Sequence, residues 1–277
     1  MIRLLQIEFI KLWNNRISKV LIISYFVLLT SIALIAAIKF DIGPVKFHLA
    51  EQGIFNFPYI WHFNTFITAL FKLFLAIVIV SMMANEYSNK TIKQNLIDGL
   101  SKKEFVLSKF LTVVTFALVS TVFVFVVSLI LGLVYSDFNE ISIIFSDLEF
   151  LPAFFLKLVG FFSFCLFLGI LVKRSAFALG FLILWVIVEQ MLFGLLGWKL
   201  VSWETAKTIK GFFPLEAMSN LIEEPFSRLK AVQSVANQIG EEFKFDYDVH
   251  WHEISIVLCW TGIFIYSSYA LLRRRDL

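Results

Sequence analysis

Six long, uninterrupted apolar runs dominate this sequence and restrict what the chain can fold into. Each is close to the roughly 20 residues that a helix needs to cross the hydrocarbon core of a bilayer. A membrane β-barrel would instead show segments of about ten residues with alternating polarity, whereas these runs are continuous and rich in Leu, Ile, Phe and Val. We therefore expect six transmembrane helices, at about residues 20–38, 61–84, 110–135, 150–172, 175–198 and 254–272.

The composition agrees with a membrane protein and excludes a soluble domain of this length. Hydrophobic residues make up 59% of the chain, aromatic residues 17% and charged residues 16%, and the mean hydropathy is +0.84. Such values lie far from those of soluble globular domains. The two cysteines, Cys165 and Cys259, fall inside apolar runs and are expected to be ordinary buried residues. The fold class predicted for residues 1–277 is a single all-α polytopic membrane domain.

The distribution of Lys and Arg predicts the orientation, because positive residues near span ends are retained on the cytoplasmic side. The loop 136–149 between the third and fourth runs holds four acidic residues and no Lys or Arg, which suits the opposite side. Both termini are therefore expected in the cytoplasm. The basic residues that border the spans on the predicted cytoplasmic side are Arg3, Lys11, Arg16, Lys19, Lys90, Lys93, Lys102, Lys103, Lys109, Lys173, Arg174, Arg273, Arg274 and Arg275.

The residues before the first apolar run predict an amphipathic helix in the membrane interface. Ile2, Leu5, Phe9 and Leu12 recur at helical spacing, while charged residues occupy the other faces. Two roles are compatible with this pattern. The helix can be an anchor that sets the orientation electrostatically, or a lever that packs against a partner.

A polar island at residues 85–109 separates the second and third apolar runs. Ser101 precedes Glu104 by the spacing of a capping box, and Gly99 supplies a break just upstream. The island is therefore expected to fold as helix, turn, helix. A short helix over about 89–97 would present Lys90, Lys93 and Gln94 to solvent or to a docked protein. The alternative is a basic loop that serves only to orient the chain.

Several short motifs resemble those of ABC-2 type transporter permeases. In and around the island the resemblance rests on Glu86, Thr91, Leu96, Gly99, Leu100-Ser101, Phe105 and Lys109. It extends to the Glu8-x-x-Lys11 start and to the ending Arg274-Arg275-Asp276-Leu277. In topology it covers the whole chain, and the short motifs themselves are moderately specific.

The resemblance implies that this chain is the membrane subunit of an ATP-binding cassette exporter in the bacterial cytoplasmic membrane. The segment 86–105, which includes Gly99, would form a coupling helix on a separate ATPase subunit. The contact residues carried over from the family are Glu86, Lys90, Thr91, Lys93 and Gln94. A second permease subunit, identical or not, would complete the translocation unit within the membrane lipid.

ATP and Mg would be bound by the partner, because the chain has no G-x-x-x-x-G-K-[ST] phosphate loop. No cofactor, enzymatic activity or nucleic-acid partner is predicted for this chain itself, which also lacks an H-E-x-x-H motif and a nucleophile elbow. The alternative function is a non-transporting membrane sensor or assembly subunit. The transported substrate does not follow from the sequence.

Two charged residues fall near the middle of predicted spans, where charges are expensive and often functional. Counted from the outer ends at 1.5 Å per residue, Lys72 and Glu189 lie at depths of about 16 and 14 Å. We expect them to form a buried ion pair. The alternative is that they line a watery cavity without meeting. Lys157 lies nearer the outer surface and is expected to extend its ammonium group toward water.

The long segment 199–253 is expected to lie outside the membrane. After Pro225, the residues Phe226, Leu229, Val232, Ala236, Ile239 and Phe243 repeat at spacings of three and four, which predicts an amphipathic helix. That helix could rest in the interface or form a lid over an exit path. His250 and His252 follow among carboxylates and are weak candidates for a metal site. The alternative is that the polar stretch around these two histidines is simply the start of the sixth span.

Overall fold

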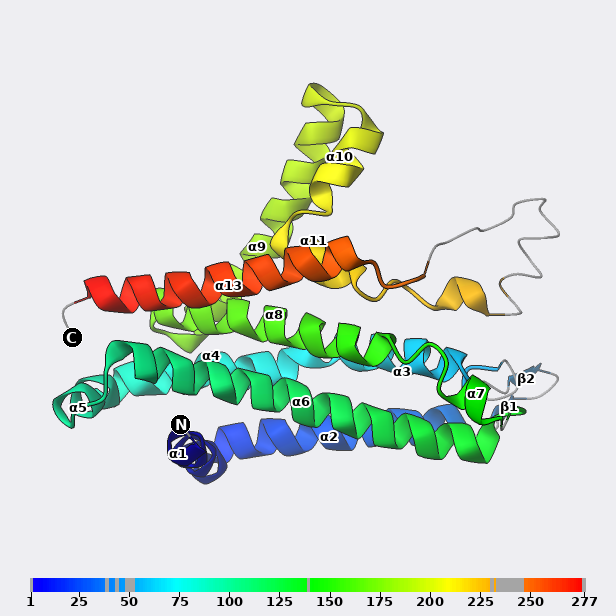
Figure 1. Ribbon diagram of the computed structural model, residues 1–277, viewed down its shortest axis with the longest axis horizontal. Coiled ribbons are helices and arrows are strands. Elements are labelled where there is room, and N and C mark those ends of the chain that lie inside the picture. The colour runs from blue at the N-terminus through cyan, green and yellow to red at the C-terminus, as the bar shows by residue number, and fades with distance from the viewer. Residues whose placement is uncertain are drawn as a thin grey trace.

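The computed structural model describes residues 2–37, 40–42, 45–47, 53–138, 140–229, 232 and 247–275. Its long helices lie roughly side by side in a bundle (Figure 1). Among these described residues, four helices are long and apolar enough to cross a membrane, and a bent helix pair raises this number to five. The class of helical membrane protein is thereby confirmed. The full count of six spans stays a prediction.

The bounds of the helices follow the apolar runs closely. Helix α8 covers Phe150–Val172, as expected, and α13 covers Trp251–Arg274. Helix α6, at Lys102–Tyr135, starts eight residues before the third apolar run because the capping box extends it. Helix α2, at Arg16–Ala37, includes most of the first expected span, and the α1 helix, at Ile2–Asn14, precedes it.

The second expected span is not one straight helix. It consists of α3, at Tyr59–Leu70, and α4, at Lys72–Ser88, which meet at an angle of 44°. The backbone N–H of Phe71 donates to Thr68 at 3.0 Å, which tightens the turn at the break. Because neither Pro nor Gly stands at the break, the usual sequence signals of a kink are missing here.

Helix α8 forms the centre of the bundle and packs against α13, α4 and α6. Apart from Lys157 and Ser163, its sequence is apolar on all sides, which is typical of a helix surrounded by others. Two glycines allow close approach. A side chain at Gly160 would meet Val257 of α13 at 3.0 Å, and one at Gly169 would meet Met83 of α4 at 3.0 Å. The core is therefore built around α8.

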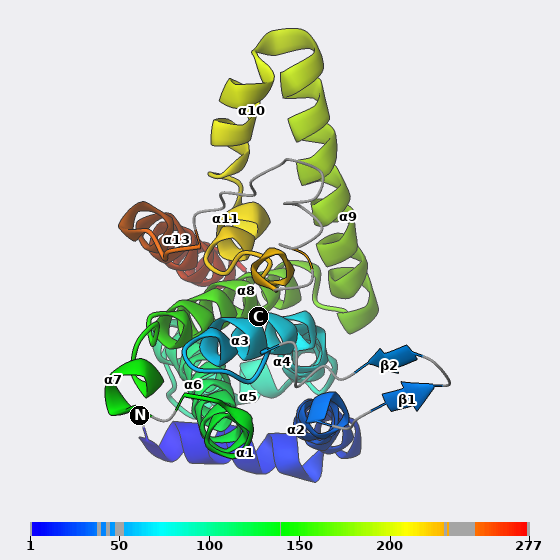
Figure 2. The ribbon, with the colours of Figure 1, turned by 90° about the vertical axis from the view of Figure 1, so that its right-hand side faces the viewer.

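A helical hairpin projects from the bundle (Figures 1 and 2). Helix α9, at Ser175–Leu195, continues into the π-helical turn η2, at Leu196–Leu200, and α10, at Trp203–Lys210, returns toward the bundle. The chain then reaches α11, at Pro214–Asn220, which packs against α13 and α8. Apolar side chains along α9 are largely exposed.

The remaining elements are short. Helix α5 covers Thr91–Ile97 and α7 covers Ile141–Ile144, while strands β1 at Phe40–Ile42 and β2 at Val45–Phe47 form an antiparallel hairpin. Of the amphipathic helix expected after Pro225, the structure has the 3₁₀ turn η3 at Phe226–Arg228. The later positions Ala236, Ile239 and Phe243 lie outside the described residues.

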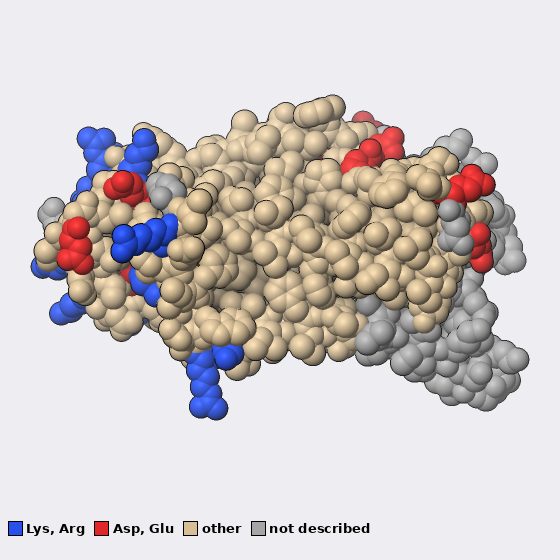
Figure 3. Space-filling view, turned by 60° about the horizontal axis from the view of Figure 1, so that its bottom comes forward, with Lys and Arg blue, Asp and Glu red and all other residues tan. Residues whose placement is uncertain are grey.

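The two ends of the bundle differ in charge. Lys and Arg gather at the end where α1, α5 and the last turn of α13 lie, and acidic side chains stand out at the opposite end (Figure 3). We call the first of these the basic end. Its position agrees with the clustering of positive residues in the sequence.

The contact between Gly132 of α6 and Phe57 gives a test of the packing. A methyl group added at Gly132 would overlap the buried ring of Phe57. We expect Gly132→Ala to destabilise the fold by about 1–3 kcal/mol, which a lower melting temperature in detergent would report. In the control Gly180→Ala, the added methyl meets no atom within 4 Å. This control should keep or raise the melting temperature, since Ala favours helices over Gly. Equal melting temperatures for the two variants would contradict the packing.

Candidate functional site: an ion-pair network at the basic end

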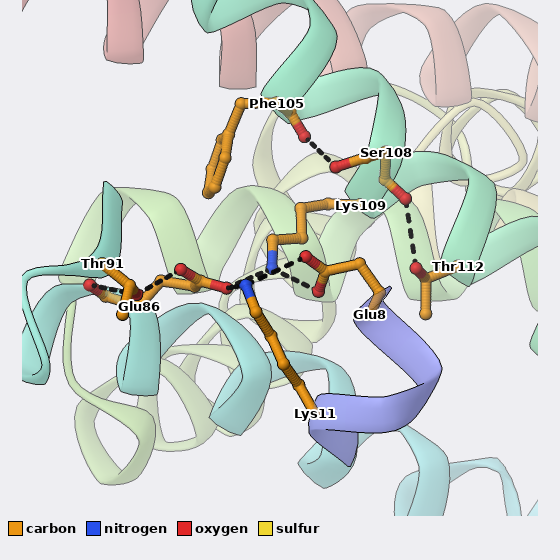
Figure 4. A network of polar contacts seen from close by, with 8 residues as sticks. All are labelled: Glu8, Lys11, Glu86, Thr91, Phe105, Ser108, Lys109 and Thr112. Carbon is orange, nitrogen blue, oxygen red and sulfur yellow. Dashed lines mark hydrogen bonds and ion pairs between the residues drawn. The ribbon is translucent and has the colours of Figure 1, made fainter. Parts of the chain in front are cut away.

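A buried lysine lies between two carboxylates at the basic end. The side chain of Lys109, in α6, is 0% exposed, and its Nζ lies 2.5 Å from Glu8 Oε2 and 2.6 Å from Glu86 Oε1. Glu8 belongs to α1 and Glu86 to the last turn of α4. Figure 4 shows the three side chains converging from three helices.

Two further residues complete the network. Nζ of Lys11 lies 3.0 Å from Glu86 Oε1 and 3.4 Å from Glu8 Oε1, and its side chain is 40% exposed. The hydroxyl of Thr91, the first residue of α5, donates to the Glu86 carboxylate. Two ammonium groups thus balance two carboxylates. Such compensation is what allows charges to be buried.

Local sequence features bring these groups together. Glu8 and Lys11 are three residues apart and so share a face of α1, which lies across the ends of α2 and α6 in Figure 2. Lys90 has a left-handed backbone (φ 55°) that turns the chain from α4 into α5. Gly99 has φ 95°, which favours glycine, and turns it again toward α6. Each turn directs a helix end toward the network.

The predicted capping box is confirmed at the start of α6. The Ser101 hydroxyl accepts from the backbone N–H of Glu104 at 3.2 Å, and the Glu104 carboxylate accepts from the backbone N–H of Ser101 at 3.0 Å. This cap fixes where α6 begins and hence the helical turn on which Lys109 lies. The ring of Phe105 lies 5.2 Å from Lys109 Nζ and covers it.

A polar hollow of about 350 Å³ adjoins the network between α1, α4 and α5. Four asparagines border it, together with Lys11 and Glu86. Burial opposes the charge of Lys11, but the carboxylates of Glu8 and Glu86 outweigh this effect and raise the Lys11 pKa above its ordinary value. The asparagines are Asn14, Asn15, Asn85 and Asn89.

The six residues expected to couple to an ATPase divide into two groups. Lys90, Lys93, Gln94 and Gly99 are exposed around α5. Glu86 is 4% exposed and its carboxylate is used inside the protein, which argues against its expected role as a surface contact. Thr91 is partly exposed and its hydroxyl donates to Glu86, so its role as a contact stays a prediction.

Sequence reasoning missed a hydrophobic member of the exposed face of α5. Ile97 is 75% exposed, whereas Ile92 of the same helix is buried and anchors it. Reasoning from the sequence also missed the link between Glu8 and Lys109, which are 101 residues apart. The signal that could have found it is Lys109 itself, a cation at the edge of an apolar run that requires a partner.

Arg275, the residue directly after α13, also makes contacts at the basic end. The guanidinium of Arg275 donates to the carbonyl oxygens of Ile170 and Leu171 at the end of α8, and to the Tyr87 hydroxyl of α4 at 3.1 Å. Lys102, at the start of α6, donates to the Arg275 carbonyl oxygen at 2.9 Å. Cations near a helix C-terminus are favourable partners for its free carbonyls.

The expected ion pair between Lys72 and Glu189 is not formed. Glu189 instead accepts hydrogen bonds from Trp185 Nε1 at 2.8 Å and from the backbone N–H groups of Leu215 and Glu216 at 3.1 and 3.2 Å. Both residues line one cleft, which corresponds to the alternative prediction. The ion pair was expected because the sequence shows neither the break between α3 and α4 nor the position of α11, whose backbone N–H groups bind Glu189.

The structure also describes the two histidines expected to bind a metal and the lysine expected to reach water. The rings of His250 and His252 lie 5.3 Å apart, centroid to centroid, and among the described residues no group of three or more His, Cys, Asp or Glu is placed to hold a metal. Lys157 is buried rather than extended toward water. It donates to the carbonyl oxygens of Ser219 and Ile222 at 3.1 and 3.2 Å.

These features define a helical membrane protein with a buried ion-pair network at one end. A model of the family described as "Protein of unknown function (DUF2705)" matches residues 20–276, so the chain belongs to this family. No curated protein matches the chain. The matched region includes Glu86, Thr91 and Lys109, whereas Glu8 and Lys11 precede it.

Removing the central cation tests the network. In Lys109→Met, the buried carboxylates of Glu8 and Glu86 would lose their buried cation and keep only the partly exposed ammonium of Lys11. We expect a loss of roughly 3–5 kcal/mol in stability, measured as unfolding in detergent. Lys103→Met, an exposed lysine on the same helix, is the matched control and should unfold like the wild type. Equal stability of both variants would show that the ion pairs of Lys109 do not stabilise the fold.

Proposed function

We propose that this chain is the membrane-spanning subunit of an ATP-binding cassette transporter, acting as an exporter. The observation that carries the proposal is that the exposed helix α5 is joined to the buried network through Thr91 and Glu86. A soluble protein seated on α5 could thereby act on α1, α4 and α6 together. The resemblance of segment 86–105 to the coupling segment of ABC-2 permeases supports this role.

The exposed surface of α5 has the character of a docking face. Lys90, Lys93 and Gln94 offer donors, and Ile97 adds an apolar side chain that water solvates poorly. Exposed apolar groups rimmed by polar ones are typical of protein interaction sites. Docking would place the ATPase at the basic end, which the positive-inside rule assigns to the cytoplasm together with both termini.

Movement of α5 would reach the spans through short, strong contacts. The Glu86 carboxylate is held by Thr91, Lys11 and Lys109, so a displacement of α5 pulls on the end of α4 and on α6. Packed helices change between discrete arrangements rather than deform continuously. ATP and Mg in the partner would drive this change, and a second permease subunit, identical or not, would complete the transport path.

The docking face can be tested directly. We expect the double variant Lys93→Glu, Ile97→Glu to lose at least about tenfold in affinity for the ATPase subunit, since it reverses a charge and buries another in the interface. The measurement is the amount of ATPase subunit, identified by mass spectrometry, that copurifies with the tagged chain from its native host. Lys207→Glu, on exposed α10, is the control and should bind normally. Equal binding by both variants contradicts docking on α5.

The coupling step has a separate test. Thr91→Val keeps the shape of the side chain but removes the hydroxyl that contacts Glu86. We expect the ATPase to remain bound, while stimulation of its hydrolysis rate by the membrane subunit falls several-fold. Unchanged stimulation would refute transmission through this contact. If no ATPase copurifies even with the wild type, the alternative function of a non-transporting sensor or assembly subunit is favoured.

A further inference from the structure

A cleft of about 460 Å³ opens where the break between α3 and α4 faces α8, α9 and α11. Its size falls within the range of pockets that hold small molecules. Most of its lining is aliphatic, and several of these side chains are more than one third exposed in the chain on its own. The exposed aliphatic side chains are Leu70, Leu73, Ile183, Val186 and Ile187.

Lys72 supplies a positive charge to this cleft. It is the first residue of α4, directly after the break, and its Nζ lies 4.4 Å from the centroid of the Phe161 ring, which also lines the cleft. An aromatic face compensates only part of the cost of removing an ammonium group from water. Within the described ranges, no carboxylate forms an ion pair with Lys72.

The acidic residues that border the cleft are already engaged. Glu189 accepts three hydrogen bonds, from Trp185 and from two backbone N–H groups of α11. Glu216 forms an ion pair with Lys210 at 2.7 Å. Neither carboxylate therefore serves as the counter-ion of Lys72, and the charge of Lys72 is left for a group that enters the cleft.

The polar groups around Lys72 leave its charge without a counter-ion. Lys157, on α8, donates to the carbonyl oxygens of Ser219 and Ile222 and lies within electrostatic range of both Lys72 and Glu253, so it takes no negative charge to Lys72. Gln190 and Ser219 add an amide and a hydroxyl to the lining. A ligand that fits must therefore combine one anionic head group with an aliphatic body.

We propose that this cleft binds an amphiphile with a single carboxylate or phosphate head group, with the head group paired to Lys72 and the aliphatic body along α9. The binding itself does not require an ATPase. The further role of the ligand as the exported cargo rests on the proposed function. An acidic amphiphile is the class of ligand whose two parts match the two kinds of surface in the cleft.

Binding is measured with the full chain in phosphatidylcholine nanodiscs, without any ATPase. A negative result in this assay is therefore distinct from a failure of the ATPase to dock on α5. The probe is radiolabelled dodecanoate, and binding to empty nanodiscs is subtracted. We expect saturable binding that weakens at least tenfold in Lys72→Met. The matched control is Lys103→Met, which removes a lysine from a different apolar groove, between α6 and α13, and should bind like the wild type.

A second variant keeps the proposal testable if Lys72→Met does not fold. Ile187→Trp fills the exposed aliphatic side of the cleft without disturbing a buried residue, and it should also abolish saturable binding. Dodecyl phosphate should compete with dodecanoate, and dodecyltrimethylammonium should not. Unchanged affinity in both cleft variants, an equal loss in Lys103→Met, or equal competition by the cationic amphiphile would each overturn the proposal.

The source of the amphiphile is resolved by a further comparison. Nanodiscs that contain phosphatidylglycerol offer an anionic bilayer lipid in place of a free amphiphile. Loss of dodecanoate binding in these discs identifies the bilayer as the source, and retained binding identifies a free acidic amphiphile. Both results agree with an anion site at Lys72 and differ only in what occupies it.

Discussion

The arrangement of the basic end depends on one buried ammonium group. Lys109 lies in a helix bundle where an unpaired charge is costly, and its Nζ is held at 2.5 and 2.6 Å by Glu8 and Glu86. To supply these carboxylates, α1 must lie across the bundle and the last turn of α4 must approach α6. The contacts of this single charge thus link three helices at this end, in addition to their apolar packing.

The shared carboxylates also link the helices of the basic end to one another. Glu86 is shared between Lys109, Lys11 and Thr91, so α5 cannot shift without disturbing contacts to α1, α4 and α6. Arg275 connects the end of α13 to α8 and α4 by hydrogen bonds to carbonyls and to Tyr87. A buried polar network of this kind favours a small number of fully satisfied arrangements, which suits a region that transmits a conformational change.

Features determined by neighbouring residues could be predicted from the sequence, and features determined by distant ones could not. The apolar run at 150–172 is helix α8, and the spacing of Ser101 and Glu104 predicted the cap of α6, because periodicity and capping are local. The break at Phe71 lacks a Pro or Gly. Glu86 was expected at the surface. Its buried position depends on Lys11 and Lys109, which lie 75 and 23 residues away and could not be recognised as its partners from the sequence. Glu189 likewise finds its donors on α11, whose position depends on the whole fold.

Three lysines in the helices of the bundle differ in how their charge is compensated. Lys109 has two carboxylates, and Lys157 has two carbonyl oxygens at 3.1 and 3.2 Å. Lys72 has the face of Phe161 at 4.4 Å and lines an open cleft. The first two arrangements are complete within the protein and so are explained by folding. The third has no carboxylate partner among the described residues, and ionisable groups inside membrane helices often mark binding sites, which is why we propose an anion as the partner of Lys72.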